Sequence, residues 1–399
     1  MRILVLCYNF PPDISAGAFR MHSFVKELEK NVADDSIIEI ITTTPNRYFN
    51  YQLDNVSDFS DEKIKIKRVN VSKISQGFIG QVLGFLKYSL AVIFLTSMRK
   101  YDLVFSTSSK LMTGFLGALI SRMKSANFYL DIRDIFSETI EDVFDKKLSL
   151  FLLPIINLIE SYTVKRASVV NIVSKGFEPY FVKKYPEKSY SFHTNGIDEE
   201  FVKFFSGKNV KNRDTKIKSN ESSIIKVLYA GNIGEGQGLD KIIPELASRM
   251  DHRNYVFQII GDGIGRKKLE GKIRQKKISN VFVIDPIERQ KLLHKYSEAD
   301  VLFIHLNDYE AFKRVLPSKI FEYSATGLPI WAGVEGYSRL FLEENVENSR
   351  MFNPCDVDDA LEKLDELVFE YTDRIEFKEM FSRATISKNM VVDFLQLKK

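Results

Sequence analysis

The feature that most constrains the fold is an alternation of short apolar runs with segments of helical period. In the first half of the chain, the runs that predict strands are 2–7, 36–43, 64–70, 102–107, 126–132, 168–173 and 189–193. The segments of helical period between them include 17–30, 79–99, 110–124 and 148–166. Such alternation is typical of βαβ units, which build a mainly parallel sheet covered by helices on both faces.

A second alternating series follows after a polar stretch at 203–220. Six lysines and arginines stand in that stretch against Asp214 alone. We interpret it as a solvated linker, and a basic arm that touches anionic lipid is the weaker alternative. The strands predicted beyond it are 224–231, 255–263, 280–286, 299–306 and 328–334. The helices predicted between and after them are 238–250, 265–277, 288–298, 317–326 and 356–371.

We therefore predict an α/β protein with two Rossmann-like, doubly wound domains. The first domain is expected at 1–200, the linker at 201–222 and the second domain at 223–384, with a C-terminal helix at about 385–399 that packs back on the first domain. In doubly wound folds, ligands bind outside the carboxyl ends of the strands.

Composition excludes several classes of protein. The formal net charge is +4, from 57 basic and 53 acidic residues, so the chain lacks the concentrated positive charge of nucleic-acid-binding proteins. Cys7 and Cys355 are far apart and lack metal-ligand spacing, which favours a reducing compartment. The chain has no HExxH pair, no GxSxG elbow and no P-loop.

One apolar segment, 78–98, approaches the length of a membrane span but carries Lys87 near its centre. It predicts a helix that is either packed on the first sheet or lying at a membrane surface, and both alternatives stay open. With no secretory signal in the sequence, we expect a cytoplasmic protein, peripherally associated with the inner membrane if the second alternative holds.

The sharpest motif is LPSKIFEYSATGLP at 316–329. Pro317 suits the first position of a helix and Gly327 suits its C-terminal cap, while Pro329 prevents the helix from continuing. The motif therefore predicts a short helix with a well-defined amino end.

That helix would present three groups to a nucleoside diphosphate. The unpaired N–H groups of Ser318 and Lys319 can receive a phosphate, and Lys319 adds a cation. Glu322 lies on the same helical face as Lys319 and can hold vicinal hydroxyls. The competing interpretation is a capped helix with a surface ion pair that contributes only about 0.3–0.5 kcal/mol.

Together with other segments, this motif resembles glycosyltransferase family 4, whose members are retaining enzymes with the GT-B fold. The resemblance runs through YNFPPDISAGAFR (8–20), LDIRDIF (130–136), TNGID (194–198), YAGNIGEGQGL (229–239), GDG (261–263) and PSKIFEYSATGLPI (317–330). Bacterial transferases of O-antigen and capsule assembly, including the L-fucosamine transferase group, are similar. The resemblance implies that Glu322 holds the donor ribose and that Ser318 and Lys319 lie at the diphosphate.

Two segments of the first domain also enter the predicted site. The loop at 11–17 is rich in small residues, and the resemblance implies that Gly17 faces donor and acceptor. Arg133 stands where many family members have a histidine, and Asp134 stands at the aspartate position that follows. Together with Asp131 they form a polar cluster at the end of a predicted strand, with a satisfied ion-pair cluster as the alternative.

The chain departs from the family pattern at positions that neutralise the diphosphate. Asn232 and Gln237 stand where many members have an arginine and a lysine, and Arg314 stands where the first of two glutamates is usual. We expect the replacement charge from Lys319, with Arg314, Arg133 or Arg266 as candidates. The predicted catalytic residues are Asp134, Arg133 and Lys319. The predicted donor-binding residues are Gly17, Asn232, Gln237, Arg266, Arg314, Ser318, Lys319 and Glu322.

Asp356 and Asp358 have the spacing of a metal–nucleotide motif, but they stand at the start of the helix predicted at 356–371. Acidic residues favour the amino end of a helix, so we interpret them as capping residues. We predict no metal and no cofactor apart from the nucleotide-sugar donor.

The expected function is transfer of a hexosyl group from a UDP-sugar to a polyprenyl-diphosphate-linked oligosaccharide, with retention of stereochemistry. The sugar is expected to be N-acetylated or deoxy, and the product a surface polysaccharide such as O-antigen or capsule. Two alternatives stay open, a non-hydrolysing UDP-sugar 2-epimerase and a non-catalytic protein that binds UDP or glycan.

Overall fold

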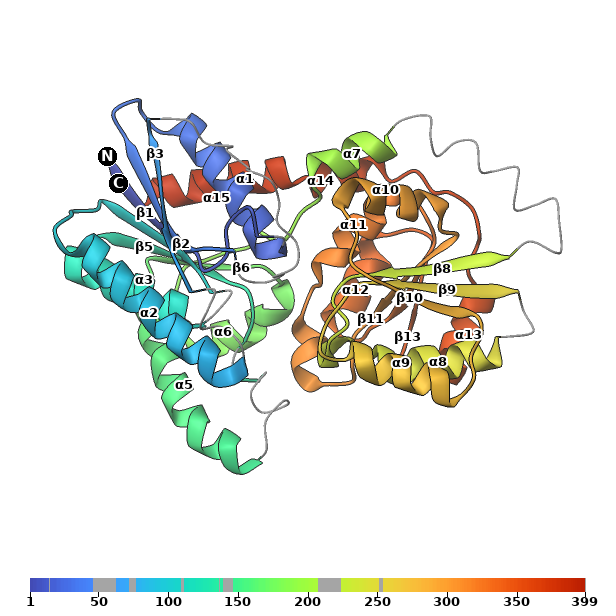
Figure 1. Ribbon diagram of the computed structural model, residues 1–399. Coiled ribbons are helices and arrows are strands. Elements are labelled where there is room, and N and C mark those ends of the chain that lie inside the picture. The colour runs from blue at the N-terminus through green and yellow to red at the C-terminus, as the bar shows by residue number, and fades with distance from the viewer. Residues whose placement is uncertain are drawn as a thin grey trace. The chain divides into compact units, whose positions relative to one another are not determined.

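The computed structural model describes residues 1–13, 15–45, 62–71, 77–108, 111–135, 137–138, 146–206, 224–250 and 254–398. The chain forms two compact units (Figure 1). Unit 1 comprises Met1–Asn195 and Arg383–Lys399, and unit 2 comprises Gly196–Ser382. The chain thus enters unit 2 before the predicted linker at 201–222, of which residues 207–222 lie outside the described residues.

Unit 1 is built on a parallel sheet with the strand order β3-β2-β1-β4-β5-β6-β7. The strands are β1 (Arg2–Leu6), β2 (Ile37–Thr43), β3 (Ile64–Val69), β4 (Leu103–Thr107), β5 (Asn127–Ile132), β6 (Val169–Ile172) and β7 (Tyr190–Ser191). Most central strand residues are buried, as expected for a sheet covered on both faces.

Helices cover both faces of this sheet (Figure 1). The helices are α1 (Ala16–Asn31), α2 (Gly77–Ser97), α3 (Leu111–Lys124), α5 (Lys146–Arg166), α6 (Glu178–Lys184) and α15 (Arg383–Gln396). Phe24 of α1 and Phe394 of α15 share one apolar core with Phe105 of β4, so the last helix of the chain completes unit 1. The opposite face is covered by α3, whose Gly117 lies against Ser106 and Phe128.

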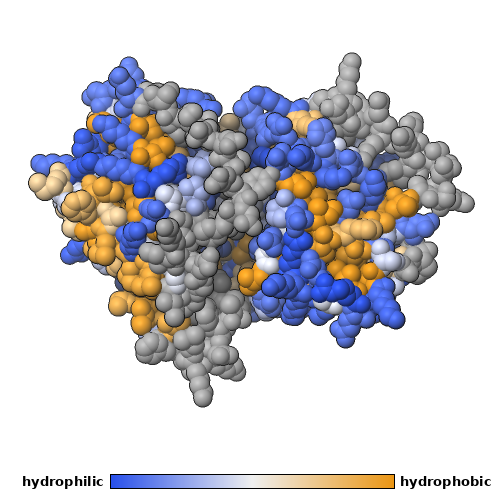
Figure 2. Space-filling model, viewed as in Figure 1, coloured by the Kyte–Doolittle hydropathy of each residue, from blue (hydrophilic) through white to orange (hydrophobic). Residues whose placement is uncertain are grey.

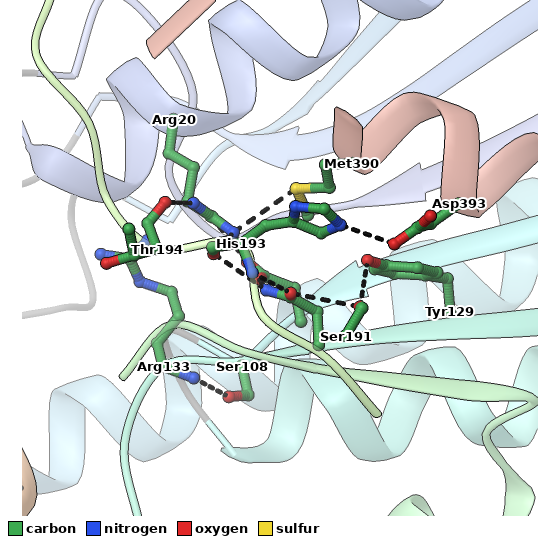
Figure 3. A network of polar contacts seen from close by, with 11 residues as sticks. Arg20, Ser108, Tyr129, Arg133, Ser191, His193, Thr194, Met390 and Asp393 are labelled. Carbon is green, nitrogen blue, oxygen red and sulfur yellow. Dashed lines mark hydrogen bonds and ion pairs between the residues drawn. The ribbon is translucent and has the colours of Figure 1, made fainter. Parts of the chain in front are cut away.

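A buried ion pair joins distant segments of unit 1 (Figure 3). Arg20 of α1 donates to both carboxylate oxygens of Asp131 at the end of β5, at 3.2 and 2.9 Å. Its remaining donors reach the carbonyl oxygens of Thr194 and His193. Asn171 of β6 also donates to Asp131, at 2.7 Å. The pair is therefore fully hydrogen-bonded, which a buried pair requires.

Unit 2 has a second parallel sheet with the order β10-β9-β8-β11-β12-β13. Its strands are β8 (Ile225–Ala230), β9 (Tyr255–Ile260), β10 (Val281–Ile284), β11 (Val301–His305), β12 (Ile330–Gly333) and β13 (Ser349–Phe352). Its helices are α7 (Glu199–Phe205), α8 (Leu239–Arg249), α9 (Arg266–Gln275), α10 (Arg289–Glu298), α11 (Ser318–Thr326), α12 (Tyr337–Asn345), α13 (Val357–Asp365) and α14 (Ile375–Met380).

Alternate residues of the strands in unit 2 enter two separate cores. Leu228 and Leu302 pack with α7, α10 and α11 on one face, whereas Val227 and Val301 pack with α8, α9 and α13 on the other. The sheet is thus covered on both faces, as the alternating pattern predicts.

The structure corrects the predicted elements in several places, and helices α6, α7 and α14 were also not predicted. The strand expected at 189–193 has only two residues, because the carbonyl oxygens of His193 and Thr194 accept hydrogen bonds from Arg20 instead of continuing the ladder. The helix expected at 356–371 ends at Asp365. Strand β13 and helix α12 were not predicted, because their short segments have no clear period.

Two glycines within helices allow a matched test of this packing. A Cβ on Gly117 of α3 would lie 2.5 Å from Oγ of Ser106 and 2.9 Å from the ring of Phe128, whereas a Cβ on Gly271 of α9 meets nothing within 4 Å. We expect Gly117→Ala to lower the free energy of unfolding by about 1–3 kcal/mol. Gly271→Ala should raise it by about 0.5–1 kcal/mol. Urea denaturation of the two variants measures both free energies of unfolding. An equal change in the two variants would contradict the packing of α3.

Candidate functional site

The predicted phosphate-binding helix is α11, at the carboxyl edge of the sheet in unit 2. Pro317 is its N-cap, so the helix begins at Ser318, one residue later than predicted. Gly327 ends it with a φ of 76°, in agreement with the predicted cap. The backbone N–H of Ala230 donates to the hydroxyl of Tyr323 at 2.8 Å, which attaches α11 to the end of β8.

Lys319 and Glu322 form a partly buried ion pair rather than a surface pair. Nζ of Lys319 lies 2.6 Å from Oε2 of Glu322 and donates to the hydroxyl of Tyr296 at 3.1 Å. Burial is the largest single cause and favours the neutral form of Lys319, but the charge and hydrogen bond of Glu322 together with the neighbouring tyrosines hold the pKa of Lys319 above its usual value. Lys319 is therefore charged, and Glu322 balances this charge. Tyr296, on α10, was not found from the sequence because it lies outside the motif.

The segment after β8 folds into a tight loop beside this pair. Oε1 of Gln237 accepts hydrogen bonds from Nδ2 of Asn232 at 2.9 Å and from the backbone N–H of Gly234 at 3.1 Å. A Cβ on Gly231 would lie 3.5 Å from Cε of Lys319, so the loop and α11 meet at this point. Asn232 and Gln237 therefore shape the loop by bonding to each other, and their role in donor binding stays a prediction.

A buried histidine that sequence reasoning missed supports the same loop. Nδ1 of His305, at the end of β11, lies 2.7 Å from the carbonyl oxygen of Gln237, and Nε2 accepts from the backbone N–H of Cys355 at 2.9 Å. Because a carbonyl only accepts, Nδ1 carries the proton and the ring is neutral. Burial lowers the pKa of His305 to about 4. No motif surrounds His305, so only the fold reveals this role.

The predicted cations of unit 2 have different surroundings. Arg266 is bound by two carboxylates, those of Glu270 at 2.8 Å and Asp285 at 2.5 Å, so its charge is already balanced. Arg314 is half-buried and stands at the end of a short 3₁₀ helix, Glu310–Arg314, shortly before α11. Of the predicted cations in this unit, Lys319 is the one placed on the first turn of α11.

In unit 1, Gly17, Arg133 and Asp134 lie near the carboxyl edge of the sheet. Gly17 is in the first turn of α1, and a Cβ on it would lie 3.9 Å from Cζ of Arg133. Burial raises the pKa of Asp134 to about 6, and the charge of Arg133 opposes this shift. Asp131, by contrast, belongs to the buried pair with Arg20, so it is a structural residue.

Asp356 acts as the predicted cap. Its Oδ1 accepts from the backbone N–H groups of Asp358 and Asp359, both at 3.1 Å, at the start of α13. Within the described ranges, no group of three or more histidine, cysteine, aspartate or glutamate side chains is arranged to hold a metal ion.

Together, the groups of unit 2 provide backbone N–H donors, a cation and a carboxylate around one strand end. β8 has β9 on one side and β11 on the other, so its carboxyl end is the switch point of this sheet. Such an arrangement can bind a nucleoside diphosphate, with phosphates at the helix end and a sugar hydroxyl at the carboxylate.

Solved structures with the same architecture establish the fold class. The chain matches Anabaena Alr3699/HepE in complex with UDP and glucose with a TM-score of 0.68 and 14% identity, over 99% of both chains. It matches the lipopolysaccharide outer core galactosyltransferase WaaB with a TM-score of 0.63 and 14% identity, over 100% of both chains. A third match is WaaG, a glycosyltransferase involved in lipopolysaccharide biosynthesis, with a TM-score of 0.63 and 14% identity over 99% of this chain and 97% of that one. The fold is therefore GT-B, as predicted.

Sequence comparison identifies the second part of the chain. Residues 211–386 match the family described as glycosyl transferases group 1, so this part is a glycosyl transferases group 1 domain. A segment of 116 residues is 32% identical to WcaI of Escherichia coli K12, which is assigned to colanic acid biosynthesis as a glycosyl transferase. The matched segment is 29% of this chain and spans 28% of that relative. The placement in glycosyltransferase family 4 and in the fucosamine group stays a prediction.

His305 gives the loop of unit 2 a measurable dependence on pH. Because its pKa is below the usual 6.5, the unfolded chain binds the proton first, so stability is fully present above pH 6.5 and is lost as the pH falls toward 4. His305→Phe leaves the carbonyl of Gln237 and the N–H of Cys355 unpaired, and should cost about 1–3 kcal/mol for each group at pH 7. The difference in the free energy of unfolding between His305→Phe and the wild type should be smaller at pH 5 than at pH 7, because the wild type loses stability as His305 is protonated. Urea denaturation at both pH values measures this, with His294→Asn, an exposed position, as the control.

Proposed function

We propose that this protein is a glycosyltransferase of surface polysaccharide assembly, such as O-antigen or capsule, and that unit 2 binds a UDP-sugar. The observation that carries the proposal is the amino end of α11, where Lys319 and Glu322 lie beside the glycine-rich loop after β8. Similar structures include one that holds UDP and glucose and one of a galactosyltransferase, which supports a UDP-linked hexose as donor.

The reaction proposed is transfer of a hexosyl group with retention of stereochemistry. The diphosphate of the donor accepts hydrogen bonds from the first N–H groups of α11, while Lys319 stabilises the charge that grows on it as the sugar leaves. Glu322 holds the ribose. For this, Lys319 exchanges its hydrogen bonds with Glu322 and Tyr296 for contacts with the phosphates, which leaves a carboxylate oxygen of Glu322 for the hydroxyls.

The acceptor hydroxyl is proposed to be oriented by unit 1. Asp134 is the group suited to this role, because its pKa of about 6 leaves it ionised and able to accept a hydrogen bond at neutral pH. We propose an N-acetylated or deoxy sugar as the transferred group, and a lipid-linked oligosaccharide as the acceptor.

Product analysis tests this function directly. Candidate UDP-sugars are first ranked by the rise that each causes in the unfolding midpoint, and the best is then incubated with lipid extracts. The proposal expects UDP release that depends on the extract, with a labelled sugar in the lipid fraction. An epimerised donor formed without acceptor would instead show an isomerase, and binding without any product would show a non-catalytic protein.

Lys319 is the residue whose removal should affect turnover most. Lys319→Ala is expected to lower kcat roughly 100- to 1000-fold, the loss that follows when one preorganised stabilising group is removed. Lys295→Ala is the matched control, because Lys295 is a partly exposed lysine of the same unit paired with Glu298. Near-normal turnover of Lys319→Ala would contradict the assigned role.

The surface of α2 supports an acceptor that lies in a membrane. Val82, Leu86, Leu90 and Phe94 recur at every fourth position and are exposed, with Leu90 at 70% and Phe94 at 78%. Figure 2 shows hydrophobic residues gathered on this side of unit 1. The opposite side of α2 is buried at Tyr88 and Val92, so the helix packs on its unit while it presents an apolar stripe.

The charges around this stripe favour an anionic lipid surface. α2 contains no aspartate or glutamate, and Lys87 and Lys100 are exposed beside the stripe. An apolar face flanked by lysines binds the boundary between headgroups and acyl chains. None of the described helices is both long and apolar enough to span a bilayer. We propose that α2 lies on the membrane surface, where a lipid-linked acceptor is found.

Vesicle binding checks this orientation. The double variant Leu90→Glu/Phe94→Glu should bind vesicles of phosphatidylglycerol and phosphatidylcholine at least about tenfold more weakly than the wild type, because burial of each side chain contributes about 1.5–3 kcal/mol. Leu340→Glu, at an exposed position of unit 2, is the control. Equal binding of the double variant and the wild type would exclude α2 as the contact.

A further inference from the structure

The hydroxyl of Tyr296 is the third member of the group that Lys319 and Glu322 form. It accepts a hydrogen bond from Nζ of Lys319 at 3.1 Å and donates to Oε2 of Glu322 at 3.4 Å. Nζ of Lys319 reaches the same carboxylate oxygen at 2.6 Å. The three side chains thus meet at Oε2, and both hydrogen bonds of Tyr296 go to residues of the proposed donor site.

The second carboxylate oxygen of Glu322 has different surroundings. Among the described residues, none donates a hydrogen bond to Oε1, whereas two donors converge on Oε2. The side chain of Glu322 keeps 13% of its surface exposed, so part of this enclosed group stays accessible. Oε1 is therefore the oxygen that a ligand hydroxyl can reach without displacing a neighbouring side chain.

The ring of Tyr296 is enclosed by aromatic side chains of two other helices. Tyr296 is fully buried on α10, and its ring lies edge-to-face with that of Tyr323 on α11, with 5.4 Å between the ring centroids. The ring of Phe201 on α7 lies 5.7 Å from it, and the guanidinium of Arg289 packs over Phe201 at 4.9 Å. Close packing of this kind restrains a buried side chain, so the hydroxyl keeps its place when Lys319 moves.

Tyr296 remains a hydrogen-bond donor at neutral pH. Burial, followed by the charge of Glu322, raises the pKa of its hydroxyl well above the usual value, so the hydroxyl keeps its proton. A tyrosine hydroxyl can donate one hydrogen bond and also accept, whereas the ammonium group of Lys319 only donates. The hydroxyl therefore accepts from Lys319 and has its own proton left for Glu322.

The movement of Lys319 that the proposed function requires leaves Glu322 in need of another donor. When Lys319 turns to the phosphates of a nucleotide, Glu322 loses its counter-charge. The charge of Glu322 also acts on Arg289, but this arginine is already bound by two other carboxylates. An enclosed carboxylate without a hydrogen-bond donor is unfavourable. The hydroxyl of Tyr296 is the group in place to donate to it.

We propose that Tyr296 is a positioning residue that makes the donor site selective for ribonucleotides. Its hydroxyl holds Oε2 of Glu322 while a nucleotide is bound, so Oε1 stays available to the hydroxyl groups of the ribose. A site built to bind hydroxyls discriminates against an analogue that lacks them, because its polar groups are then left unpaired. The inference rests on the proposed function, since it takes the nucleotide of a UDP-sugar as the ligand.

Calorimetric titration of the full chain with UDP and with 2′,3′-dideoxyuridine 5′-diphosphate tests this role. The wild type should bind UDP about 10- to 100-fold more tightly than the analogue, as hydrogen bonds to a charged group imply. Tyr296→Phe should weaken binding of UDP at least about tenfold, because Glu322 is no longer held in position. Binding of the analogue should change by no more than about twofold, whereas loss of a merely structural tyrosine would weaken both ligands equally.

Tyr185→Phe is the matched control. Tyr185 is a buried tyrosine of unit 1 whose hydroxyl also donates to a glutamate, to Oε1 of Glu160 at 3.0 Å. The control variant should leave the affinities for both ligands unchanged. Thermal unfolding of the two variants without ligand checks that each is folded at the temperature of the titrations.

A double-mutant cycle with Glu322→Gln provides a second measurement. If Tyr296 acts through Glu322, then Tyr296→Phe should change the affinity for UDP much less in the Glu322→Gln background than in the wild type. An equal loss of affinity in the two backgrounds would mean that the tyrosine acts independently of Glu322, and it would overturn the proposal.

The titrations also separate this inference from the proposed function. If Tyr296→Phe weakens binding of UDP no more than binding of the dideoxy analogue, the role of Tyr296 is overturned and the donor site stands. Absence of UDP binding by the wild type contradicts the donor site itself, and the role of Tyr296 is overturned with it.

Discussion

The close approach of two backbone loops at the carboxyl edge of the second sheet is the constraint on which the nucleotide site depends. A Cβ on Gly261, after β9, would lie 1.8 Å from the carbonyl oxygen of Gly231, after β8. The absence of side chains lets the loops bond to each other, with the N–H of Ile233 donating to Asp262 and the N–H of Gly265 donating to Ile233. Lys319 lies beside the first of these loops, with its Cε 3.5 Å from a Cβ placed on Gly231.

Enclosed polar side chains in the two units differ in how far neighbouring residues satisfy their hydrogen bonds. Arg20 and His305 have their donors and acceptors matched by neighbours, so they hold chain segments in position. Lys319 is paired with Glu322 by a contact that a ligand can replace. Arg133 has a buried donor that no described residue accepts. We propose Lys319 as a ligand-binding group because a ligand can take the place of its contact with Glu322, whereas neighbouring residues hold Arg20 and His305 in position.

Much of the fold could be predicted from the sequence. Parallel strands that are buried on both faces appear as short apolar runs, and the segments between these runs have the periodicity of helices. Helix α11 could also be predicted, because a proline such as Pro317 and a glycine such as Gly327 are typical of the two ends of a helix. Strand β13 could not be predicted because it is short and has no clear period. The roles of Tyr296 and His305 could not be predicted because they depend on contacts between segments far apart in the chain. The roles of Asp131 and Arg133 could not be separated either, since only the fold shows which of two nearby arginines pairs with the carboxylate.

The position of α15 has a consequence for the order of folding during synthesis. Phe394 and Met390 of this helix belong to the core of unit 1, and Met390 contacts the guanidinium of Arg20. All of unit 2 is translated between the two parts of unit 1. The ribosome therefore releases all of unit 2 before the segment that completes the core of unit 1, so Phe24 and Phe105 lack their contacts with Phe394 until the last residues emerge.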